Sequence, residues 1–256
     1  MTDNREKINI VIPAAGRGSR FSDGSWKKPK PFIDVNGRPM LESVIENISP
    51  AESHTYLLLN DKHMRENIDG ILSLDALTQE IIEVSGVTEG TACTVLLAHE
   101  RINNSTPLMI ANSDQIVDFD INDYIDDCFN RELDGSILVF KDRFKDPKWS
   151  FARVDAAGLV VEVAEKKAIS DLATVGIYLF SDGSKFIDAA QKMISANDRV
   201  NNEFYTCPVY NYMIKQGARI GVYEIEAKSM HGIGTPEDLN AYLKLINSRP
   251  SEDRPD

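Results

Sequence analysis

Cysteine is scarce in this 256-residue sequence, and no apolar run is long enough to span a membrane. The three cysteines, Cys93, Cys128 and Cys207, form no CxxC or Cys/His cluster, so neither a disulfide framework nor a zinc site is expected. A membrane-spanning helix needs roughly 18 or more consecutive apolar residues, and residues 1–7 are polar and charged. The sequence therefore predicts a cytoplasmic protein with buried free thiols.

Basic residues are in the minority as well. The chain carries 28 Lys and Arg against 40 Asp and Glu, which gives a formal net charge of −12. Nucleic acids and anionic membranes favour clustered basic residues, so we expect neither as a partner. If the protein handles phosphate groups, it must concentrate its positive charge locally.

Short apolar runs alternate with amphipathic stretches along most of the chain, which is typical of an α/β fold built from βαβ units. In the middle, four strand candidates follow one another with little helix between them, which predicts an antiparallel extension of the sheet. The predicted strands cover residues 8–14, 55–60, 79–84, 107–111, 134–141, 151–154, 160–164, 174–180 and 219–225. The predicted helices cover residues 39–48, 61–68, 91–103, 184–195, 203–216 and 236–246, the last with Thr235 as N-cap.

Directly after the first predicted strand, small residues and two glycines form a candidate phosphate loop. Without a Cβ, a glycine lets backbone N–H groups close around phosphate oxygens, and Arg17 and Arg20 could neutralise phosphate charge. An ordinary strand-to-helix turn is the alternative. The loop lacks the GKS or GKT ending of a P-loop and the third glycine of GxGxxG, which disfavours kinases and dehydrogenases. Its residues are Ala14, Ala15, Gly16, Arg17, Gly18, Ser19 and Arg20.

Three lysines lie between prolines in the next segment, Trp26-Lys27-Lys28-Pro29-Lys30-Pro31-Phe32. Proline restricts the residue before it, so we expect Lys28 and Lys30 to be extended. A rigid cation beside a phosphate loop suits phosphoryl chemistry. A solvated basic loop is the alternative, which we favour for Lys27.

AAGRGSR (14–20), KPKPF (28–32) and Asn36-Gly37-Arg38-Pro39-Met40 follow one another in this order. Together they resemble the N-terminal signature of the sugar-phosphate nucleotidyltransferase (NTP transferase) family, especially compact bacterial members for capsule or surface-polysaccharide synthesis and small cytidylyltransferases. The resemblance implies a Rossmann-like (GT-A-type) mixed sheet with helices on both faces and an antiparallel acceptor-binding extension. It also implies one domain over residues 1–247, with a nucleotide-binding part to about 130, an acceptor-binding part from 131 and a disordered tail at 248–256.

By this resemblance, Gly16, Gly18, Ser19 and Arg20 hold the triphosphate of an NTP. Lys30 acts on the α-phosphate as the main electrostatic catalyst, and Arg20 assists it. The acceptor's phosphate oxygen attacks the α-phosphorus and pyrophosphate leaves, so no protein nucleophile is needed. The remaining nucleotide contacts expected are Ala14, Ala15, Arg17, Gly90, Thr91, Ala92, Asn112 and Ser113.

The segment Val87-Thr88-Glu89-Gly90-Thr91-Ala92 resembles the family's base-binding turn. A glycine that simply precedes a helix is the alternative. The family's upstream glutamine is not evident here, so the base stays open. The chain is short after its last predicted helix compared with the larger sugar enzymes, and on this ground we slightly favour CTP and a small acceptor.

The resemblance makes Asp114, which follows the strand at 107–111, the first ligand of Mg²⁺, whose preference for hard oxygens it suits. Asp118 and Asp120 are alternatives that fit a solvated acidic turn better. Gly232 stands where the family has its second metal aspartate. Phosphates and water, or Glu224 or Glu226, would then complete the metal shell.

The resemblance assigns acceptor recognition to the second half of the chain. Glu165-Lys166-Lys167 resembles an EKP segment with lysine in place of proline, and Gly176 matches the following strand. Glu203 and Tyr205 would begin a helix that closes the acceptor pocket, although a helix-start carboxylate and a core aromatic explain them equally well.

The predicted function is therefore transfer of a nucleoside monophosphate from an NTP to a small phosphorylated acceptor, by a monomer or homodimer. One rival is a GT-A glycosyltransferase, for which Asp118-Phe119-Asp120 supplies a formal DxD motif. The other is a non-catalytic nucleotide-binding regulatory protein, which would bind an NTP without turnover.

Overall fold

A computed structural model describes residues 7–21, 26–50 and 52–248, and its sheet divides into a parallel and a mainly antiparallel half. In the parallel half, β1 lies between β4 and β6, and β5 pairs with β4. These strands are largely apolar because helices cover both faces of the sheet. Their bounds are β1 Ile8–Ala14, β4 Ser53–Asn60, β5 Glu80–Val84 and β6 Leu108–Ala111.

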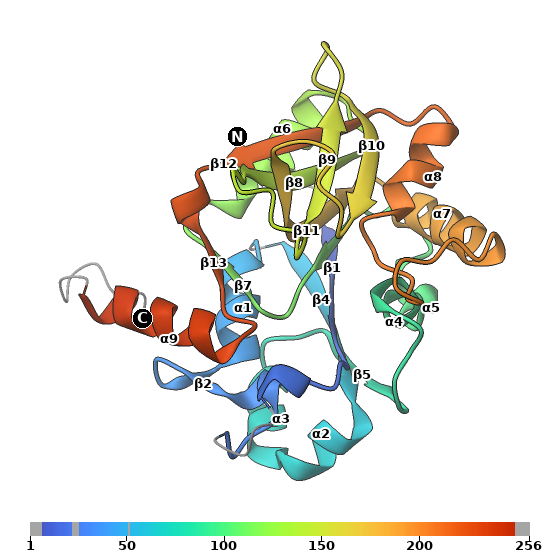
Figure 1. Ribbon diagram of the computed structural model, residues 1–256. Coiled ribbons are helices and arrows are strands. Elements are labelled where there is room, and N and C mark those ends of the chain that lie inside the picture. Colours follow the sequence, from blue (N-terminus) through green and yellow to red (C-terminus); the bar gives the residue numbers. More distant parts are fainter. Residues whose placement is uncertain (1–6, 22–25, 51, 249–256) are drawn as a thin grey trace, which may run out of the picture.

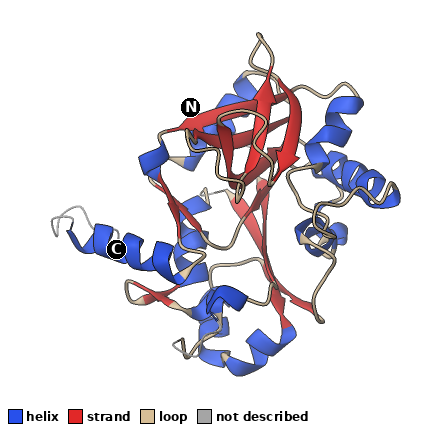
Figure 2. Cartoon of the chain, in the orientation of Figure 1, coloured by secondary structure: helices blue, strands red, loops and turns tan. Residues whose placement is uncertain are grey.

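The other half of the sheet is the antiparallel extension that the sequence predicts. β11 pairs antiparallel with β6, β8 and β9, and β10 continues from β9, while β12 pairs parallel with β8. Figure 2 shows these strands gathered in the upper part of the molecule. Their bounds are β8 Gly135–Lys141, β9 Ser150–Val154, β10 Val160–Glu165, β11 Leu172–Phe180 and β12 Ile220–Ile225.

Helices cover both faces, as the alternation of side chains along β1 requires. Ile8, Ile10 and Ile12 pack into one apolar cluster with α1, α6 and α9, and Val11 packs into another with α4, α7 and α8. The two groups lie on opposite sides of the strands in Figure 1, where α1 and α9 are on the left and α4, α7 and α8 on the right. The helices are α1 Met40–Ile48, α2 Asp61–Glu66, α3 Ile68–Asp75, α4 Thr91–Leu96, α5 His99–Ile102, α6 Ile121–Asn130, α7 Gly183–Ser195, α8 Val209–Lys215 and α9 Pro236–Ser248.

Short elements surround the ends of the parallel strands. The hairpin β2–β3 precedes α1, and β7 pairs antiparallel with β13. The Thr235 hydroxyl accepts the Asp238 N–H at 3.1 Å, which confirms the predicted cap of α9. The short elements are η1 Ser19–Phe21, η2 Lys30–Phe32, β2 Asp34–Val35, β3 Arg38–Pro39, β7 Gln115–Val117, η3 Ala227–Ser229 and β13 Met230–Gly232.

One predicted helix start is wrong. The helix expected at 203–216 begins only at Val209, after Pro208. Asn201 and Asn202 have positive φ angles of 49° and 64°, and Val200 and Glu203 exchange two backbone hydrogen bonds across them. Two left-handed residues between bridged neighbours form a tight hairpin turn, which a helix cannot contain.

Other helix predictions differ in extent. The segment 61–68 becomes α2 and continues into α3, which the sequence analysis missed, and 91–103 is divided into α4 and α5. The analysis also missed α6, although its buried residues Ile121, Tyr124, Ile125 and Cys128 have helical spacing. Because half of its ten residues are aspartate or asparagine, the segment as a whole is not predominantly apolar.

The three cysteines are free thiols, with Cys128 and Cys207 buried and Cys93 partly so. Among the described residues, no helix has the length and apolar character to span a membrane. Ser248 belongs to α9, and the rest of the predicted tail, 249–256, lies outside the described residues. The single domain with its two parts remains a prediction.

Candidate active site

Two adjoining cavities lie at the carboxyl ends of β1 and β6. The first has a volume of about 610 Å³ and the second about 710 Å³. Thr91, Asn112, Asp114 and Glu203 line both cavities and form their shared wall. Ligands of open α/β sheets bind at the carboxyl ends of the strands, so this position suits a site for two substrates.

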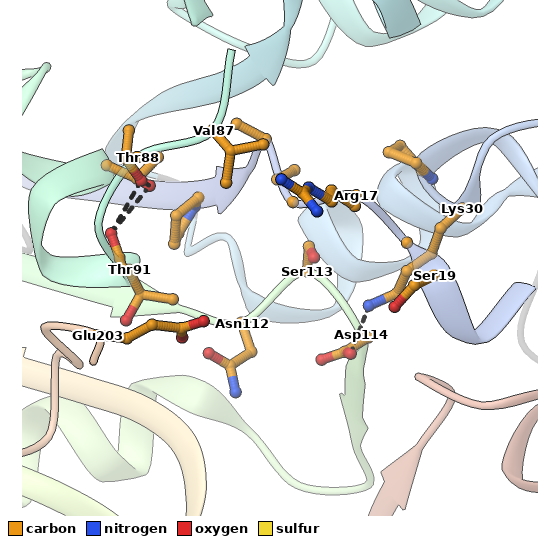
Figure 3. A pocket seen from close by; sticks show the side chains of 18 residues that line it. Arg17, Ser19, Lys30, Val87, Thr88, Thr91, Asn112, Ser113, Asp114 and Glu203 are labelled. Carbon is orange, nitrogen blue, oxygen red and sulfur yellow. Dashed lines mark hydrogen bonds and ion pairs between the residues drawn. The ribbon is translucent and has the colours of Figure 1, made fainter. Parts of the chain in front are cut away.

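The first cavity gathers most of the residues predicted to bind the nucleotide. Figure 3 shows Arg17, Ser19, Lys30, Ser113 and Asp114 around one space. Val87 and Thr88 of the predicted base-binding turn line the cavity as well, and so do Pro13, Pro31 and Thr94, for which no role was predicted. The predicted residues in its lining are Ala14, Ala15, Gly16, Arg17, Gly18, Ser19, Lys30, Gly90, Thr91, Asn112, Ser113 and Asp114.

The two glycines of the loop after β1 differ in their surroundings. Gly18 has a φ of +61°, and an added Cβ would lie 3.0 Å from the Lys30 Cβ, so the backbone conformation itself favours glycine there. Gly16 has no heavy atom within 4 Å of an added Cβ. The space beside Gly16 opens into the cavity and can receive a ligand atom.

Lys30 and Asp114 form an ion pair at the wall between the cavities. The Lys30 Nζ donates to the Asp114 Oδ2 at 2.5 Å, and the two side chains are 18% and 17% exposed. An anionic ligand can therefore compete with Asp114 for the Lys30 ammonium, and a cation can compete with Lys30 for the carboxylate.

The predicted extended conformation of Lys30 is wrong, because Lys30 begins η2. Lys28 lies in a bend, and its extended conformation stays a prediction. The Phe32 N–H donates to the Pro29 carbonyl at 2.9 Å and the Ile33 N–H to the Lys30 carbonyl at 3.2 Å. These turn hydrogen bonds outweigh the extended preference of a residue that precedes proline.

The turn before α4 also lines the first cavity. Gly90 has a φ of +132°, and an added Cβ would lie 2.4 Å from the Phe204 carbonyl oxygen, so glycine is required. Ala92, predicted to bind the nucleotide, is fully buried outside the cavity lining. Its N–H donates to the Phe204 carbonyl at 3.0 Å, which leaves no backbone donor on Ala92 for a base.

Every residue predicted to bind the acceptor lines the second cavity: Glu165, Lys166, Gly176, Glu203 and Tyr205. Arg20 lines this cavity too, and not the first. Arg20 is therefore separate from the cavity that gathers the other predicted triphosphate contacts, and its role remains a prediction. The sequence analysis missed Gln115, Lys148, Trp149, Ser150, Thr206 and Asp238, which are brought to this cavity from separate elements.

Charged and aromatic side chains lie together in the second cavity. Burial raises the pKa of Glu165, against the hydrogen bond that Ser150 donates to its carboxylate and the nearby charge of Lys166. The Lys166 Nζ donates to the Tyr205 hydroxyl at 2.6 Å and lies 4.6 Å from the centre of that ring. Burial also raises the pKa of Tyr205. The cavity thus offers both a cation and a half-buried carboxyl group to one ligand.

Gly176 connects the strand β11 to the shared wall. An added Cβ there would lie 2.2 Å from the Asn112 Nδ2, and the Gly176 φ is +93°. The Asn112 N–H donates to the Gly176 carbonyl at 2.9 Å. A glycine at position 176 therefore lets Asn112 approach the sheet closely. This close approach explains the glycine better than contact with a ligand alone.

Asp114 is the best-placed carboxylate for a metal ion, since the predicted alternatives have other partners or lie elsewhere. Asp118 pairs with the His231 Nε2 at 3.0 Å, and Asp120 caps α6. Glu224 pairs with Lys141 at 2.9 Å and lines neither cavity. In the part of the chain that the structure describes, no three His, Cys, Asp or Glu residues are grouped to hold a metal.

Gly232, at the place of the family's second metal aspartate, lines the second cavity. An added Cβ would have its nearest neighbours at 3.9 Å, the Gln115 Oε1, and at 4.0 Å, the Asp238 Oδ2. These are ordinary contact distances, so the structure would accommodate a side chain there.

A mixed α/β sheet with a glycine-rich loop after its first strand and two adjoining polar cavities defines a nucleotide-binding enzyme of the Rossmann-like class. A model of the nucleotidyl transferase family matches residues 9–245, so the chain belongs to that family. The recognition from three sequence motifs and the enzyme class, a nucleotidyltransferase, are thereby confirmed.

Individual relatives are more distant. The chain is 27% identical over 178 residues to the bifunctional protein GlmU of Methanococcus aeolicus, which covers 68% of this chain and 40% of the relative. It is 48% identical over 48 residues to the 2-aminoethylphosphonate cytidylyltransferase of Lancefieldella rimae, 19% of this chain and 20% of the relative. The chain spans less than half the length of the first curated relatives it matches.

A solved structure confirms the predicted fold. The nucleoside-diphosphate-sugar pyrophosphorylase of Vibrio cholerae RC9 superposes with a TM-score of 0.76 at 24% identity, covering 92% of this chain and 99% of that one. At this identity the similarity establishes the fold alone.

Proposed function

We propose that this chain is a magnesium-dependent nucleotidyltransferase that joins an NTP to a small phosphorylated acceptor. The observation that carries the proposal is the shared wall of the two cavities, where Lys30 and Asp114 pair at 2.5 Å. An NTP in the first cavity and an acceptor in the second would meet at this wall. Proximity of two oriented substrates is the main requirement of such a displacement.

In the reaction, an oxygen of the acceptor phosphate forms a bond to the α-phosphorus of the NTP. The bond from that phosphorus to the oxygen bridging the α- and β-phosphates breaks, and pyrophosphate leaves with the electron pair. The products are the activated acceptor, which carries the nucleoside monophosphate, and pyrophosphate. No covalent enzyme intermediate is required.

Lys30 would stabilise the negative charge that develops at the α-phosphate. Its ammonium is held in place before the substrates arrive, which is the arrangement that makes electrostatic catalysis effective. The open backbone at Gly16 and the side chain of Arg17 would bind the β- and γ-phosphates. Arg20 and Lys166, both in the second cavity, would bind the acceptor phosphate.

The residues present fit a lightly coordinated Mg²⁺. Magnesium is usually bound by one or two carboxylates together with substrate phosphates and water. Asp114 offers one carboxylate that lines both cavities, and it would hold the ion. When bound, Mg²⁺ would neutralise phosphate charge.

We propose CTP slightly ahead of other NTPs, with a sugar 1-phosphate or another alcohol or polyol phosphate as the acceptor. The short match to a cytidylyltransferase supports this choice. We further propose a cytoplasmic role in supplying activated units for capsule or surface-polysaccharide synthesis, in keeping with the motifs at 14–40.

A glycosyltransferase is less well supported by the site. Asp118 and Asp120 of the formal DxD motif line neither cavity. Asp118 pairs with His231, and Asp120 accepts the Asn122 N–H at 2.9 Å as the cap of α6. A DxD motif works by ligating the metal of a sugar nucleotide, which these two contacts oppose.

The test is a screen for pyrophosphate release with ATP, CTP, GTP and UTP against sugar, polyol and amino-alcohol phosphates, in the presence of Mg²⁺. Release that depends on both one NTP and one acceptor supports the proposal. Sugar transfer from a sugar nucleotide, without pyrophosphate, would establish the glycosyltransferase instead. Saturable NTP binding without release from any pair would establish the non-catalytic protein.

A further inference from the structure

The hairpin turn at residues 200–203 presents Glu203 to both cavities. Asn201 and Asn202 have φ angles of 49° and 64°, and the Glu203 N–H and carbonyl bond to Val200 at 2.9 Å and 3.0 Å. Consecutive left-handed residues of this kind make a type I′ turn, one of the most compact hairpin connections. The direction of the Glu203 side chain therefore depends on how this turn is held.

Arg199 makes three hydrogen bonds and one ring contact, one of them to the turn itself and one to the turn 87–92. Its Nε donates to the Asn197 Oδ1 at 2.6 Å, and its Nη1 donates to the Asn202 carbonyl at 3.1 Å. Its Nη2 donates to the carboxylate of Glu89. The guanidinium carbon also lies 4.0 Å from the centre of the Phe204 ring, which is a cation–π contact.

Glu89 belongs to the turn 87–92 that lines the first cavity, so Arg199 connects the two cavities. The backbone repeats this connection, because the Phe204 N–H donates to the Glu89 carbonyl at 2.8 Å and the Ala92 N–H to the Phe204 carbonyl at 3.0 Å. Thr206 donates both its N–H and its hydroxyl to the Thr91 hydroxyl, each at 3.1 Å. A displacement of one turn must move the other.

On the basis of the proposed function, we infer that Arg199 is a positioning residue that couples NTP binding to the placement of Glu203. An NTP that fixes the turn 87–92 would, through Arg199, also fix the turn 200–203 and its carboxylate at the acceptor. The Arg199 side chain is only 27% exposed and lines neither cavity. Its effect on the acceptor is therefore indirect.

The first test measures hydrogen–deuterium exchange with and without CTP and Mg²⁺, and needs neither an acceptor nor turnover. In the wild type, CTP should slow exchange at the amides of both 87–92 and 200–203. This range leaves out Phe204 and Thr206, whose N–H groups bond to the turn 87–92 without Arg199. In Arg199→Ala the protection of 87–92 should persist, and that of 200–203 should fall at least about tenfold. Arg199→Lys keeps the charge but not the planar fork, so its loss of protection should be intermediate.

A matched control is Arg101→Ala, which breaks a two-pronged ion pair with Glu80 at 2.7 Å and 2.9 Å outside both cavities. This variant should keep CTP-dependent protection of both segments. CTP protection of 200–203 that survives in Arg199→Ala overturns the inference. So does a wild type in which none of CTP, ATP, GTP and UTP protects both segments.

The second test uses the NTP and acceptor found in the pyrophosphate screen. Misplacement of a substrate-positioning group by about 1 Å can cost roughly 10²-fold. Arg199→Ala should therefore raise the acceptor KM at saturating NTP at least about tenfold, while the Kd for the NTP measured without acceptor changes by less than about threefold. A change in this Kd as large as the change in the acceptor KM would contradict a positioning role. If the wild type shows coupled protection but never releases pyrophosphate, the proposed function fails and the coupling stands.

Discussion

Gly16→Ala should weaken phosphate binding without disturbing the fold, because it adds one carbon to an open space in the first cavity. No heavy atom lies within 4 Å of the added Cβ, and Gly16 is not among the glycines with positive φ. The protein should therefore fold as before. If phosphate oxygens approach the Gly16 backbone, the same carbon must block them.

The expected magnitudes follow from these two facts. Replacing a glycine in a compatible conformation stabilises a protein by about 0.4–1 kcal/mol through the unfolded chain, so the free energy of unfolding should stay the same or rise slightly. A hydrogen bond to a charged group contributes about 1.5–3 kcal/mol. Loss of one such bond should raise the Kd for the NTP roughly tenfold to hundredfold.

The assay is calorimetric titration of the NTP into wild type and variant, combined with urea unfolding. Gly232→Ala is the matched control, because its Cβ also fits but lies in the second cavity, 3.9 Å from the Gln115 Oε1. The control should bind the NTP like the wild type. An unchanged NTP affinity in Gly16→Ala would refute the assignment of this loop to phosphate binding.

Four further variants test the site and its surroundings. Lys30→Ala should keep the fold and lower kcat about 10²-fold, as loss of one preorganised charge does; wild-type turnover would remove Lys30 from the mechanism. Gly176→Ala places a Cβ 2.2 Å from the Asn112 Nδ2 at a φ of +93°, and urea unfolding should show a loss of about 2–4 kcal/mol; wild-type stability would mean that this contact relaxes freely. Burial raises the pKa of Glu165 above its ordinary 4.5, so the stability of the wild type should fall as pH rises from 4.5 through the folded-state pKa. Glu165→Gln should remove this fall. Denaturant titrations should then show that the free energy of unfolding of the variant, relative to that of the wild type, is higher at pH 8 than at pH 4. Gly232→Asp supplies a second carboxylate and should lower the Mg²⁺ concentration for half-maximal turnover, whereas an unchanged requirement would argue against a metal ion at this wall.

The sequence predicted most of the fold because its strands are strongly marked. The strand predicted at 8–14 is β1, Ile8–Ala14, and those of the antiparallel extension agree within two residues at each end. Continuous apolar runs between turns leave few alternatives for the backbone. The acidic helix α6 was missed, since half of its ten residues are aspartate or asparagine.

Much of the candidate site was also predictable, because it is built from contiguous motifs. The glycine loop, Lys30 and Asp114 do line one cavity, and the predicted acceptor residues line the other. Their catalytic and binding roles remain predictions.

Several features of the candidate site depend on the tertiary structure alone. The sequence could not show that Arg20 lies in the second cavity, because that depends on the left-handed turn at Gly18. It could not show that Ala92 is withdrawn from the site, because its N–H is taken by Phe204, more than a hundred positions away.

What the sequence by itself determined was most of the strands, the family and the position of the glycine-rich loop after β1, since each is encoded in contiguous stretches of the chain. Only the tertiary structure decided that Glu203 lines both cavities and that Arg199 ties the turn 200–203 to the turn 87–92. The physical reason is that a guanidinium can donate to any carboxylate or carbonyl oxygen, so the sequence does not specify its partners. The fold brings the acceptor oxygens of Glu89, Asn197 and Asn202 within reach of Arg199.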